Sequence, residues 1–290
     1  MRNDYSGLAR MRRFTKCHNF MRIDRVKEVF RKDGVRLKLS SPSEFNDPFD
    51  STGVVSGTPM RSFIDEYLSV KTSLHDTKVR GLIAAGDYEE LGKIVRDDFS
   101  SALESRKVFD DFIRIFCVVA GCADDNSTSL MWSHYADKSK GVRVEIDFSE
   151  TPVVPLSICY CASAPILDLT GEEHYSGDMP YIEKFIIECI FTKNAAWSYE
   201  HEMRAIFPIA DSDIDECIRK GVPIVKDGNI YYWQPNRSAI KRIDFGVMAD
   251  RQEIDNTIKM LIENGFHDVQ FFLAKKDSAS YGYRYEPYRI

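Results

Sequence analysis

The segment AAWSYEHEMRAIF, residues 195–207, places two carboxylates and a guanidinium group at alternating positions. The pattern predicts a β-strand, in which alternate side chains share one face. Glu200, Glu202 and Arg204 then share a face, while His201 points to the other face with apolar neighbours. The two carboxylates repel, so the pKa of one rises unless Arg204 compensates. In a cleft the pair can act as general base and charge stabiliser, whereas on an exposed strand edge it only aids solubility.

A second candidate is the loop SPSEFNDPFD, residues 41–50. Its two prolines stiffen the backbone, and Asn46 and Asp47 have short polar side chains that bond to neighbouring amides. We expect the two phenylalanines to anchor the loop to the core. Two interpretations stay open: a structural Asx turn, or a preformed loop in which Asn46, Asp47 and Ser41 present polar groups to a ligand.

The third candidate is STSLMWSHYADKSKG, residues 127–141, which begins with capping residue types and predicts a short helix. His134 and Tyr135 lie three and four residues after Met131, and therefore beside it on the helix. Both end the helix, where a histidine serves either as a structural hydrogen-bonding group or as part of a site. Gly141 opens the following strand and permits close approach of another backbone segment.

Other chemistry is disfavoured. On a strand, His201 points away from both glutamates, and H-E-x-x-H spacing is absent, so we expect no metal site. The seven cysteines are odd in number and include no C-x-x-C pair, and Cys159-x-Cys161 is a poor zinc arrangement on one strand face. Reduced, mostly buried thiols are expected. P-loop, dinucleotide-binding and nucleophile-elbow motifs are also missing.

Charge is unevenly distributed along the chain. The net charge is −6, yet residues 1–38 hold twelve Lys or Arg and four Asp or Glu. This basic segment indicates either an anionic ligand, such as a phosphate, a dinucleotide or a nucleic-acid strand, or a solvated helix face. No apolar run approaches the roughly 20 residues that span a bilayer, and no signal-peptide pattern is seen. We therefore expect a cytoplasmic protein without a membrane partner.

The elements that must position these residues are interspersed strands and helices. We expect one α+β domain over 1–290, with mixed or antiparallel sheets and a charged helical insert at 61–107. Residues 155–162 are expected to pair with 141–148 as the following strand. Strands are predicted at 11–14, 35–40, 112–121, 141–148, 155–162, 200–207, 229–234, 240–248 and 269–275, and helices at 24–32, 179–197 and 250–265.

Three motifs carry a family resemblance. LSSPSEFNDPFD, SLMWSHYADKSKGVRVEIDF and WSYEHEMRAIF together resemble a widespread bacterial family known only as a domain of unknown function. Its members combine an F-N-D-P-F loop, an M-W-x-x-Y-A segment and a W-x-x-E-x-E-x-R strand in this order. The resemblance covers roughly residues 12–275 and supplies no reaction.

A more distant likeness does supply a reaction. A first-strand Arg or His, a central polar-aromatic segment and a late E-x-E strand are similar to the ADP-ribosyltransferase plan, in which NAD lies in a cleft of a split-sheet core. The likeness implies that Glu202 is catalytic and that Glu200 orients the acceptor. It also implies that Tyr135 stacks on nicotinamide. The pyrophosphate would meet Arg13 or, in the alternative assignment, Arg12.

The remaining residues implied to bind NAD are Ser41, Asn46, Asp47, His134 and Arg204. One departure is that STS at 127–129 precedes a helix and does not end a strand.

The expected function is therefore NAD-dependent ADP-ribosyl transfer or NAD hydrolysis, with a protein or nucleic-acid acceptor. A bacterial toxin or antiphage-defence role, with a neutralising or regulatory protein partner, follows from the resemblance alone. Two alternatives stay open. One is a non-catalytic ligand-sensing or protein-binding module, and the other is a nuclease that uses His134 with Glu200 or Glu202.

Overall fold

The computed structural model describes residues 15–71, 74, 76–121, 128–170, 181–277 and 279–289. The chain divides into two compact units, each built from discontinuous segments. Unit 1 comprises Met1–Ser41, Phe112–Ile158 and Ala196–Ile290, and unit 2 comprises Pro42–Asp111 and Cys159–Ala195. The expectation of a single domain with an insert at 61–107 stays a prediction.

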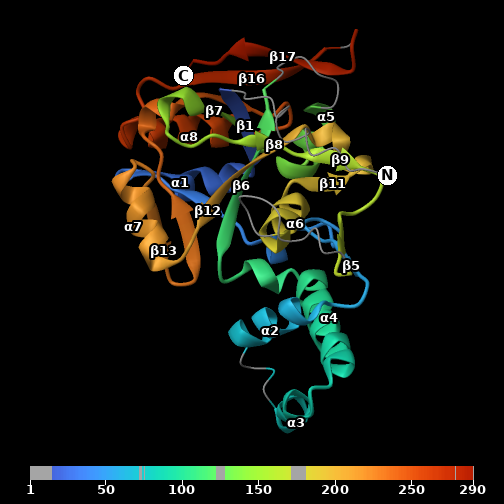
Figure 1. Cartoon of the computed structure of the whole chain (residues 1–290). Coiled ribbons are helices and arrows are strands. Elements are labelled where there is room, and N and C mark those ends of the chain that lie inside the picture. Colours follow the sequence, from blue (N-terminus) through green and yellow to red (C-terminus); the bar gives the residue numbers. More distant parts are fainter. Residues whose placement is uncertain are drawn as a thin grey trace. The chain divides into compact units, whose positions relative to one another are not determined.

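Unit 1 is organised around an eight-stranded sheet with the order β17-β16-β15-β7-β1-β6-β12-β8 (Figure 1). Most neighbours are antiparallel, but β15 and β16 are parallel, with helix α8 in the connection between them. The mixed sheet and its helices confirm the α+β class. The strands are β1 Lys16–Met21, β6 Ile113–Ala120, β7 Val142–Asp147, β8 Leu156–Ser157, β12 Glu202–Pro208, β15 Ile240–Phe245, β16 Gln270–Asp277 and β17 Gly282–Pro287.

One face of this sheet forms the main hydrophobic core. Helix α8, Arg251–Glu263, contributes Ile254, Ile258 and Leu261 to that core, at spacings that place them on one helix face. The side chain of Asp250 caps the helix by accepting hydrogen bonds from the N–H groups of the next turn. The prediction of a helix at 250–265 is thereby confirmed.

The first expected helix, 24–32, is wrong in extent. A 3₁₀ turn at Ile23–Arg25 leads into α1, which covers only Val26–Val29. The chain then enters β2, Phe30–Arg31, which pairs with β3, Gly34–Val35, across a two-residue turn. The two turn residues are Lys32 and Asp33, and Gly34 already belongs to β3, so a hairpin follows the short helix. The expected strand 11–14 lies outside the described residues.

A second sheet of unit 1 has three strands in the order β13-β14-β4. They are β13 Ile224–Asp227, β14 Ile230–Trp233 and β4 Leu37–Leu39. Trp233 is buried in the same core, where its ring lies 5.7 Å from that of Phe116 on β6. Helix α7, Asp211–Arg219, precedes β13 and was not predicted from the sequence.

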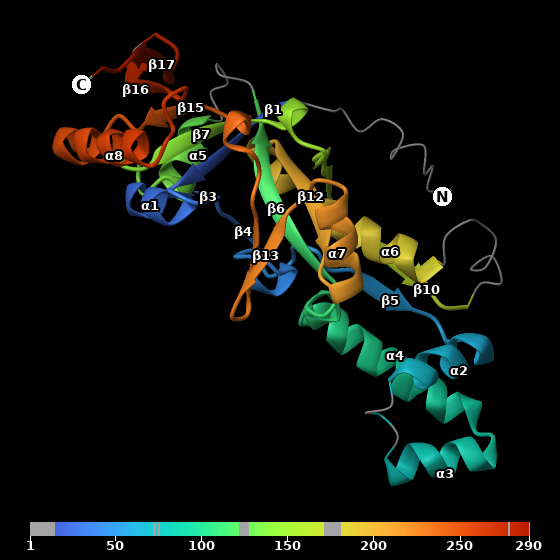
Figure 2. The same cartoon turned by 90° about the vertical axis from the view of Figure 1, so that its left-hand side faces the viewer.

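Unit 2 contains the helices expected between 61 and 107: α2 Arg61–Val70, α3 Thr77–Ala85 and α4 Tyr88–Glu104. Asp76 and Asp87 cap α3 and α4 with their side chains. Helices α2 and α4 pack together through the rings of Phe63 and Phe99, whose centroids are 6.2 Å apart (Figure 2). The contact between α2 and α4 is thus apolar and lies within unit 2.

Two short parallel strand pairs complete unit 2. They join β5 Val54–Ser56 to β10 Ile166–Asp168, and β9 Cys159–Cys161 to β11 Thr192–Asn194. The prediction that 155–162 pairs with 141–148 is wrong, because β1 and β15 already occupy both edges of β7. The expected helix 179–197 is also shorter: α6 ends at Ile190, and β11 follows.

No helix among the described residues has the length and apolar character that a membrane span requires.

Candidate functional site

The E-H-E segment is not a continuous strand. Residues Ala195–Glu200 form a 3₁₀ helix, and β12 begins only at Glu202. Between them, His201 has a φ of 46° in the left-handed region. Histidine enters that region more readily than most residues, although the conformation still stores strain. The prediction that Glu200 shares a strand face with Glu202 is therefore wrong, because the chain turns between them.

The polar side of this segment is buried. Only 3% of Glu200, 7% of Glu202 and 1% of Arg204 is exposed. Strand β12 also lies between β6 and β8, so it is not a sheet edge. Met203, Ala205 and Phe207 point to the opposite face and join the core, as the alternation predicts. A solubility role for the two glutamates is thus excluded, because neither side chain lies in solvent.

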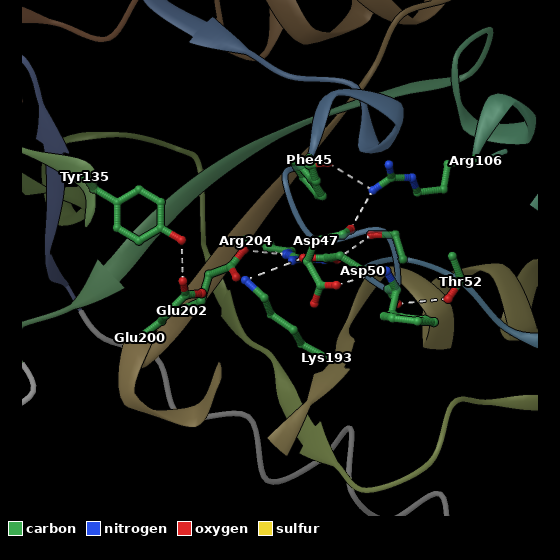
Figure 3. Close-up of polar contacts among 12 residues, drawn as sticks. Phe45, Asp47, Asp50, Thr52, Arg106, Tyr135, Lys193, Glu200, Glu202 and Arg204 are labelled. Atoms are coloured by element: carbon green, nitrogen blue, oxygen red, sulfur yellow. Dashed lines mark hydrogen bonds and ion pairs between the residues drawn. The ribbon is translucent and has the colours of Figure 1, made fainter. Parts of the chain in front are cut away.

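Each glutamate has its own hydrogen-bond donor within unit 1 (Figure 3). The Nε–H of Arg204 donates to Oε1 of Glu202 at 2.6 Å. The hydroxyl of Tyr135 donates to Oε1 of Glu200. A buried polar group needs such partners, because burial without a hydrogen bond costs free energy. The two acids are thereby held by different elements, one by β12 itself and the other by the last residue of helix α5.

Helix α5, Thr128–Tyr135, ends in an unusual backbone turn. Asp137, Lys138 and Ser139 have φ values of 48°, 54° and 66°, although none is glycine. The N–H of Ser139 donates to the Trp132 carbonyl at 3.0 Å and that of Met248 donates to the Ser139 carbonyl at 2.9 Å, so the turn is tied at both sides. A strained turn that is held in this way fixes the end of the helix that carries Tyr135.

Gly141 follows this turn and confirms the expected close approach. A Cβ atom at this position would collide with the carbonyl oxygen of Met21 on β1. Helix α5 itself lies against β1: the ring of Trp132 meets Phe20 edge-on at 5.4 Å. Its indole N–H also donates to the Tyr285 hydroxyl at 3.2 Å. These contacts place α5 over the face of the sheet opposite the main core.

The sheet register adds a histidine to the same face. Glu202 pairs with Val119, Val119 pairs with His18, and His18 pairs with Glu145. Residues that face each other across strands point to the same side. His18 therefore lies on the Glu202 side of the sheet, two strand spacings away, or roughly 9–10 Å. His18 was not predicted as a site residue from the sequence, because KCHNFM lacks a clean alternation of apolar and polar residues.

His18 and Glu145 influence each other's protonation. His18 Nε2 lies 3.7 Å from Glu145 Oε2, and Lys16 Nζ lies 3.5 Å from Glu145 Oε1. Burial lowers the pKa of His18 below its ordinary value, against the attraction of Glu145. His18, and then Lys16, lower the pKa of Glu145 to about 2. Near neutral pH the ionised carboxylate of Glu145 therefore lies beside the buried imidazole of His18.

His134, in contrast, is exposed. Its ring lies 6.4 Å from that of Tyr199, which is 6.0 Å from the ring of Trp197. These three aromatic side chains come from α5 and from the 3₁₀ helix that precedes Glu200. His134 thus belongs to an aromatic group next to the buried carboxylates in sequence, and its expected role at the site stays a prediction.

In unit 2, hydrogen bonds within the SPSEFNDPFD loop and from Arg106 hold its backbone. The N–H of Phe49 donates to Oδ1 of Asp47 at 2.9 Å, which confirms the Asx turn. Arg106 donates to the carbonyls of Phe45 and Asp47 at 3.2 and 2.8 Å (Figure 3). The expectation that both phenylalanines anchor the loop is wrong for Phe49, which is 75% exposed.

A buried ion pair lies beside this loop. Lys193 Nζ on β11 is 3.5 Å from Oδ2 of Asp50, and both side chains are almost inaccessible. Asp47 is buried as well, whereas Asn46 is exposed. The loop therefore combines a buried acidic side with an exposed side that carries Asn46 and Phe49.

The structure thus brings together four of the expected residues within unit 1: Glu200, Glu202, Arg204 and Tyr135. Ser41 is buried at the end of the same unit's first segment. Asn46 and Asp47 belong to unit 2, and the expectation that they share a cleft with the glutamates stays a prediction. Arg12 and Arg13 lie outside the described residues.

Among the residues that the structure describes, no group of three or more His, Cys, Asp or Glu side chains is placed to hold a metal ion.

Comparisons with models of protein families, with curated proteins and with solved structures gave no significant match. The resemblance carried by the three sequence motifs therefore stays a prediction. Any functional conclusion depends on the chemistry of the residues themselves.

Proposed function

We propose that the protein cleaves NAD and transfers ADP-ribose to a protein or nucleic-acid acceptor, or to water. The observation that carries the proposal is the pair of buried carboxylates in unit 1, each held by a separate donor. Glu202 is paired with Arg204, and Glu200 accepts the Tyr135 hydroxyl. Two acids with different partners can take different roles in one reaction.

Glu202 suits the bond-breaking step. Departure of nicotinamide from NAD leaves a ribose with oxocarbenium character, as in glycoside cleavage. A carboxylate that is already oriented stabilises this growing positive charge without reorganisation. The ion pair with Arg204 restricts the Glu202 side chain, although it also offsets part of the negative charge. Glu202 is therefore assigned as the catalytic carboxylate.

Glu200 suits the acceptor side of the reaction. As a general base it would take the proton from the incoming hydroxyl, amine or water. The bond from Tyr135 orients one of its oxygens, and the ring of Tyr135 would then border the nicotinamide. Different roles for Glu200 and Glu202 would show in the products, because loss of the base impairs transfer to the acceptor more than cleavage of NAD.

His18 supports the same reading from the first described strand. The ADP-ribosyltransferase likeness calls for a first-strand Arg or His, and His18 on β1 faces the Glu202 side of the sheet. The proposal includes an ADP-ribosyltransferase-like core, membership of the bacterial family described above and a cytoplasmic toxin or antiphage-defence role. A neutralising or regulatory protein partner belongs to that role.

The test is to incubate the full chain with NAD and to measure free nicotinamide and acceptor labelling in parallel. We expect Glu202→Gln to lower nicotinamide release by roughly 10²–10³-fold, because the substitution keeps the shape and removes the charge. Glu200→Gln is expected to reduce labelling more than release. Glu150→Gln is the matched control, since Glu150 forms an exposed ion pair with Lys241 at 3.3 Å.

A second measurement addresses the diphosphate. Arg12→Ala and Arg13→Ala, singly and together, are expected to weaken NAD binding by roughly 1–3 kcal/mol if a charge-assisted hydrogen bond is lost. Unchanged affinity in the double variant would remove the basic segment from the site. Full nicotinamide release by a folded Glu202→Gln variant, as judged by its circular dichroism, would end the ADP-ribosyltransferase proposal.

A further inference from the structure

Strand β9 of unit 2 carries two cysteines with their sulfur atoms in contact. Cys159 and Cys161 are separated by one residue, so both thiols point to the same face of the strand. Their Sγ atoms are 3.4 Å apart, within hydrogen-bonding distance for sulfur. Cys159 is exposed and Cys161 is half-buried. Among the described cysteines only Cys17 and Cys189 are buried, so the expectation of mostly buried thiols is wrong.

We propose that Cys159 and Cys161 are a modification site at which a low-molecular-weight disulfide, such as oxidised glutathione, forms a reversible intramolecular disulfide. The proposal is independent of NAD cleavage. It rests on the contact between the two sulfur atoms and on the exposure of one of them, because thiol–disulfide exchange requires access as well as proximity.

The exposed thiol reacts first. The thiolate of Cys159 attacks one sulfur of the oxidant, forms a mixed disulfide and releases one thiolate of the small molecule. Cys161 then loses its proton to solvent and attacks the Cys159 sulfur, which expels the second small thiolate. Both protein thiols are thereby oxidised, and one molecule of the small disulfide is reduced to two thiols.

The environment of Cys161 fits this order. Burial, followed by the hydrogen bond with Cys159, raises the pKa of Cys161 to about 11. Cys161 therefore stays protonated near neutral pH, and its S–H can donate to the sulfur of Cys159. Cys159 is the exposed thiol of the pair and is therefore the one that meets the oxidant first.

The strand geometry makes the product reducible. Residues two apart on a strand have Cα atoms roughly 6.6 Å apart, near the upper limit of about 6.8 Å for a disulfide. Ring closure must therefore bend β9, whose residues Cys159 and Cys161 pair with Thr192 and Asn194 of β11. A disulfide that forms at the expense of backbone geometry is more easily reduced than a relaxed one.

The experiment uses the full-length protein in buffers with oxidised or reduced glutathione. Both cysteines lie on the tryptic peptide 144–184, which contains no other cysteine. After oxidised glutathione, acid quenching and alkylation, we expect this peptide to be unalkylated and lighter by two hydrogen atoms than the reduced peptide. Excess reduced glutathione should restore two alkylatable thiols.

Three variants complete the design. Cys161→Ser should accumulate a stable glutathione adduct on Cys159, because no second thiol resolves it. Cys159→Ser should react more slowly, since only the half-buried thiol remains. Cys217→Ser removes a half-buried cysteine of unit 1 and should behave like the wild type.

Two outcomes would overturn the proposal: a wild-type peptide that stays doubly alkylated in oxidised glutathione, or one that accumulates glutathione adducts without the internal disulfide. A disulfide that resists excess reduced glutathione would overturn its reversibility. The wild-type measurement decides the question even if a serine variant fails to fold.

Discussion

Asp244→Asn offers a direct test of the buried charges on the polar face of the sheet in unit 1. Asp244 on β15 is fully buried and joins two guanidinium groups. Arg143 Nε and Nη2 lie 2.8 and 2.6 Å from Oδ2, and Arg242 Nε lies 2.5 Å from Oδ1. The substitution preserves volume and one acceptor oxygen, so it removes the charge without opening a cavity.

The expected loss of stability in Asp244→Asn follows from the two arginine side chains that remain. Arg143 and Arg242 would then face a neutral amide, with the ring of Tyr285 4.1 Å from the first guanidinium group and the ring of Phe272 3.7 Å from the second. Breaking a buried ion pair typically costs about 3–5 kcal/mol, because the partner charge is left uncompensated. Since about 1 kcal/mol shifts Tm by roughly 2–4 °C for a large domain, we expect a decrease of roughly 6–20 °C in Tm.

The assay should resolve unit 1 from unit 2, because unfolding of a chain with two units is not assured to be two-state. Hydrogen exchange of the amides of β7 and β15 under native conditions reports the free energy of opening at the altered position. Glu150→Gln is the control, since its exposed pair with Lys241 contributes little. If Asp244→Asn changes the opening free energy no more than the control does, the reasoning about buried charge is refuted.

Four further variants probe other contacts. Tyr135→Phe removes the donor to Glu200 and should lower the free energy of unfolding by about 1.5–3 kcal/mol, as measured in urea, and an unchanged value would argue against that hydrogen bond. Because the pKa of Glu145 is depressed to about 2, its contribution is present above the ordinary pKa of 4.5 and is lost as pH falls from 4.5 to 2; urea titrations should show a shallower loss over that window in Glu145→Gln. Protonation of buried His18 opposes folding below pH 6.5, so His18→Gln should flatten the decrease in stability just below that pH, and an unchanged slope would contradict the burial of a neutral imidazole. Arg106→Met removes two hydrogen bonds to loop carbonyls and should accelerate hydrogen exchange at 45–50 without affecting β15.

Local pattern was sufficient to predict many elements. The strands at 112–121, 141–148, 240–248 and 269–275 and the helix at 250–265 have clear periodicity or capping residues, and each is present. The pairing partners of the strands could not be predicted in the same way. Nothing near 155–162 indicates that β7 is already occupied on both sides by β1 and β15, because those strands are far away in sequence. Register over long separations is decided by the whole sheet.

The candidate site was predictable to the same extent. The face shared by Glu202 and Arg204 follows from the alternation of a real strand, and both lie there as expected. The prediction for Glu200 was wrong, because Glu200 ends a 3₁₀ helix and His201, in the left-handed region, separates it from the strand. His18 was missed for another reason: its place opposite Val119 depends on pairing with β6, which no local pattern encodes.

The position of β1 at the centre of the large sheet has a consequence for synthesis on the ribosome. Its chain segment ends at Met21, but its partners β6 and β7 begin only at Ile113 and Val142. At roughly 5–20 residues per second, the nascent strand waits on the order of 5–20 s before a neighbour emerges. During that interval its backbone groups are unpaired and available to other chains. Folding of this protein in the cell should therefore depend on chaperones that bind early, and slower translation before β6 should lower the yield of native protein.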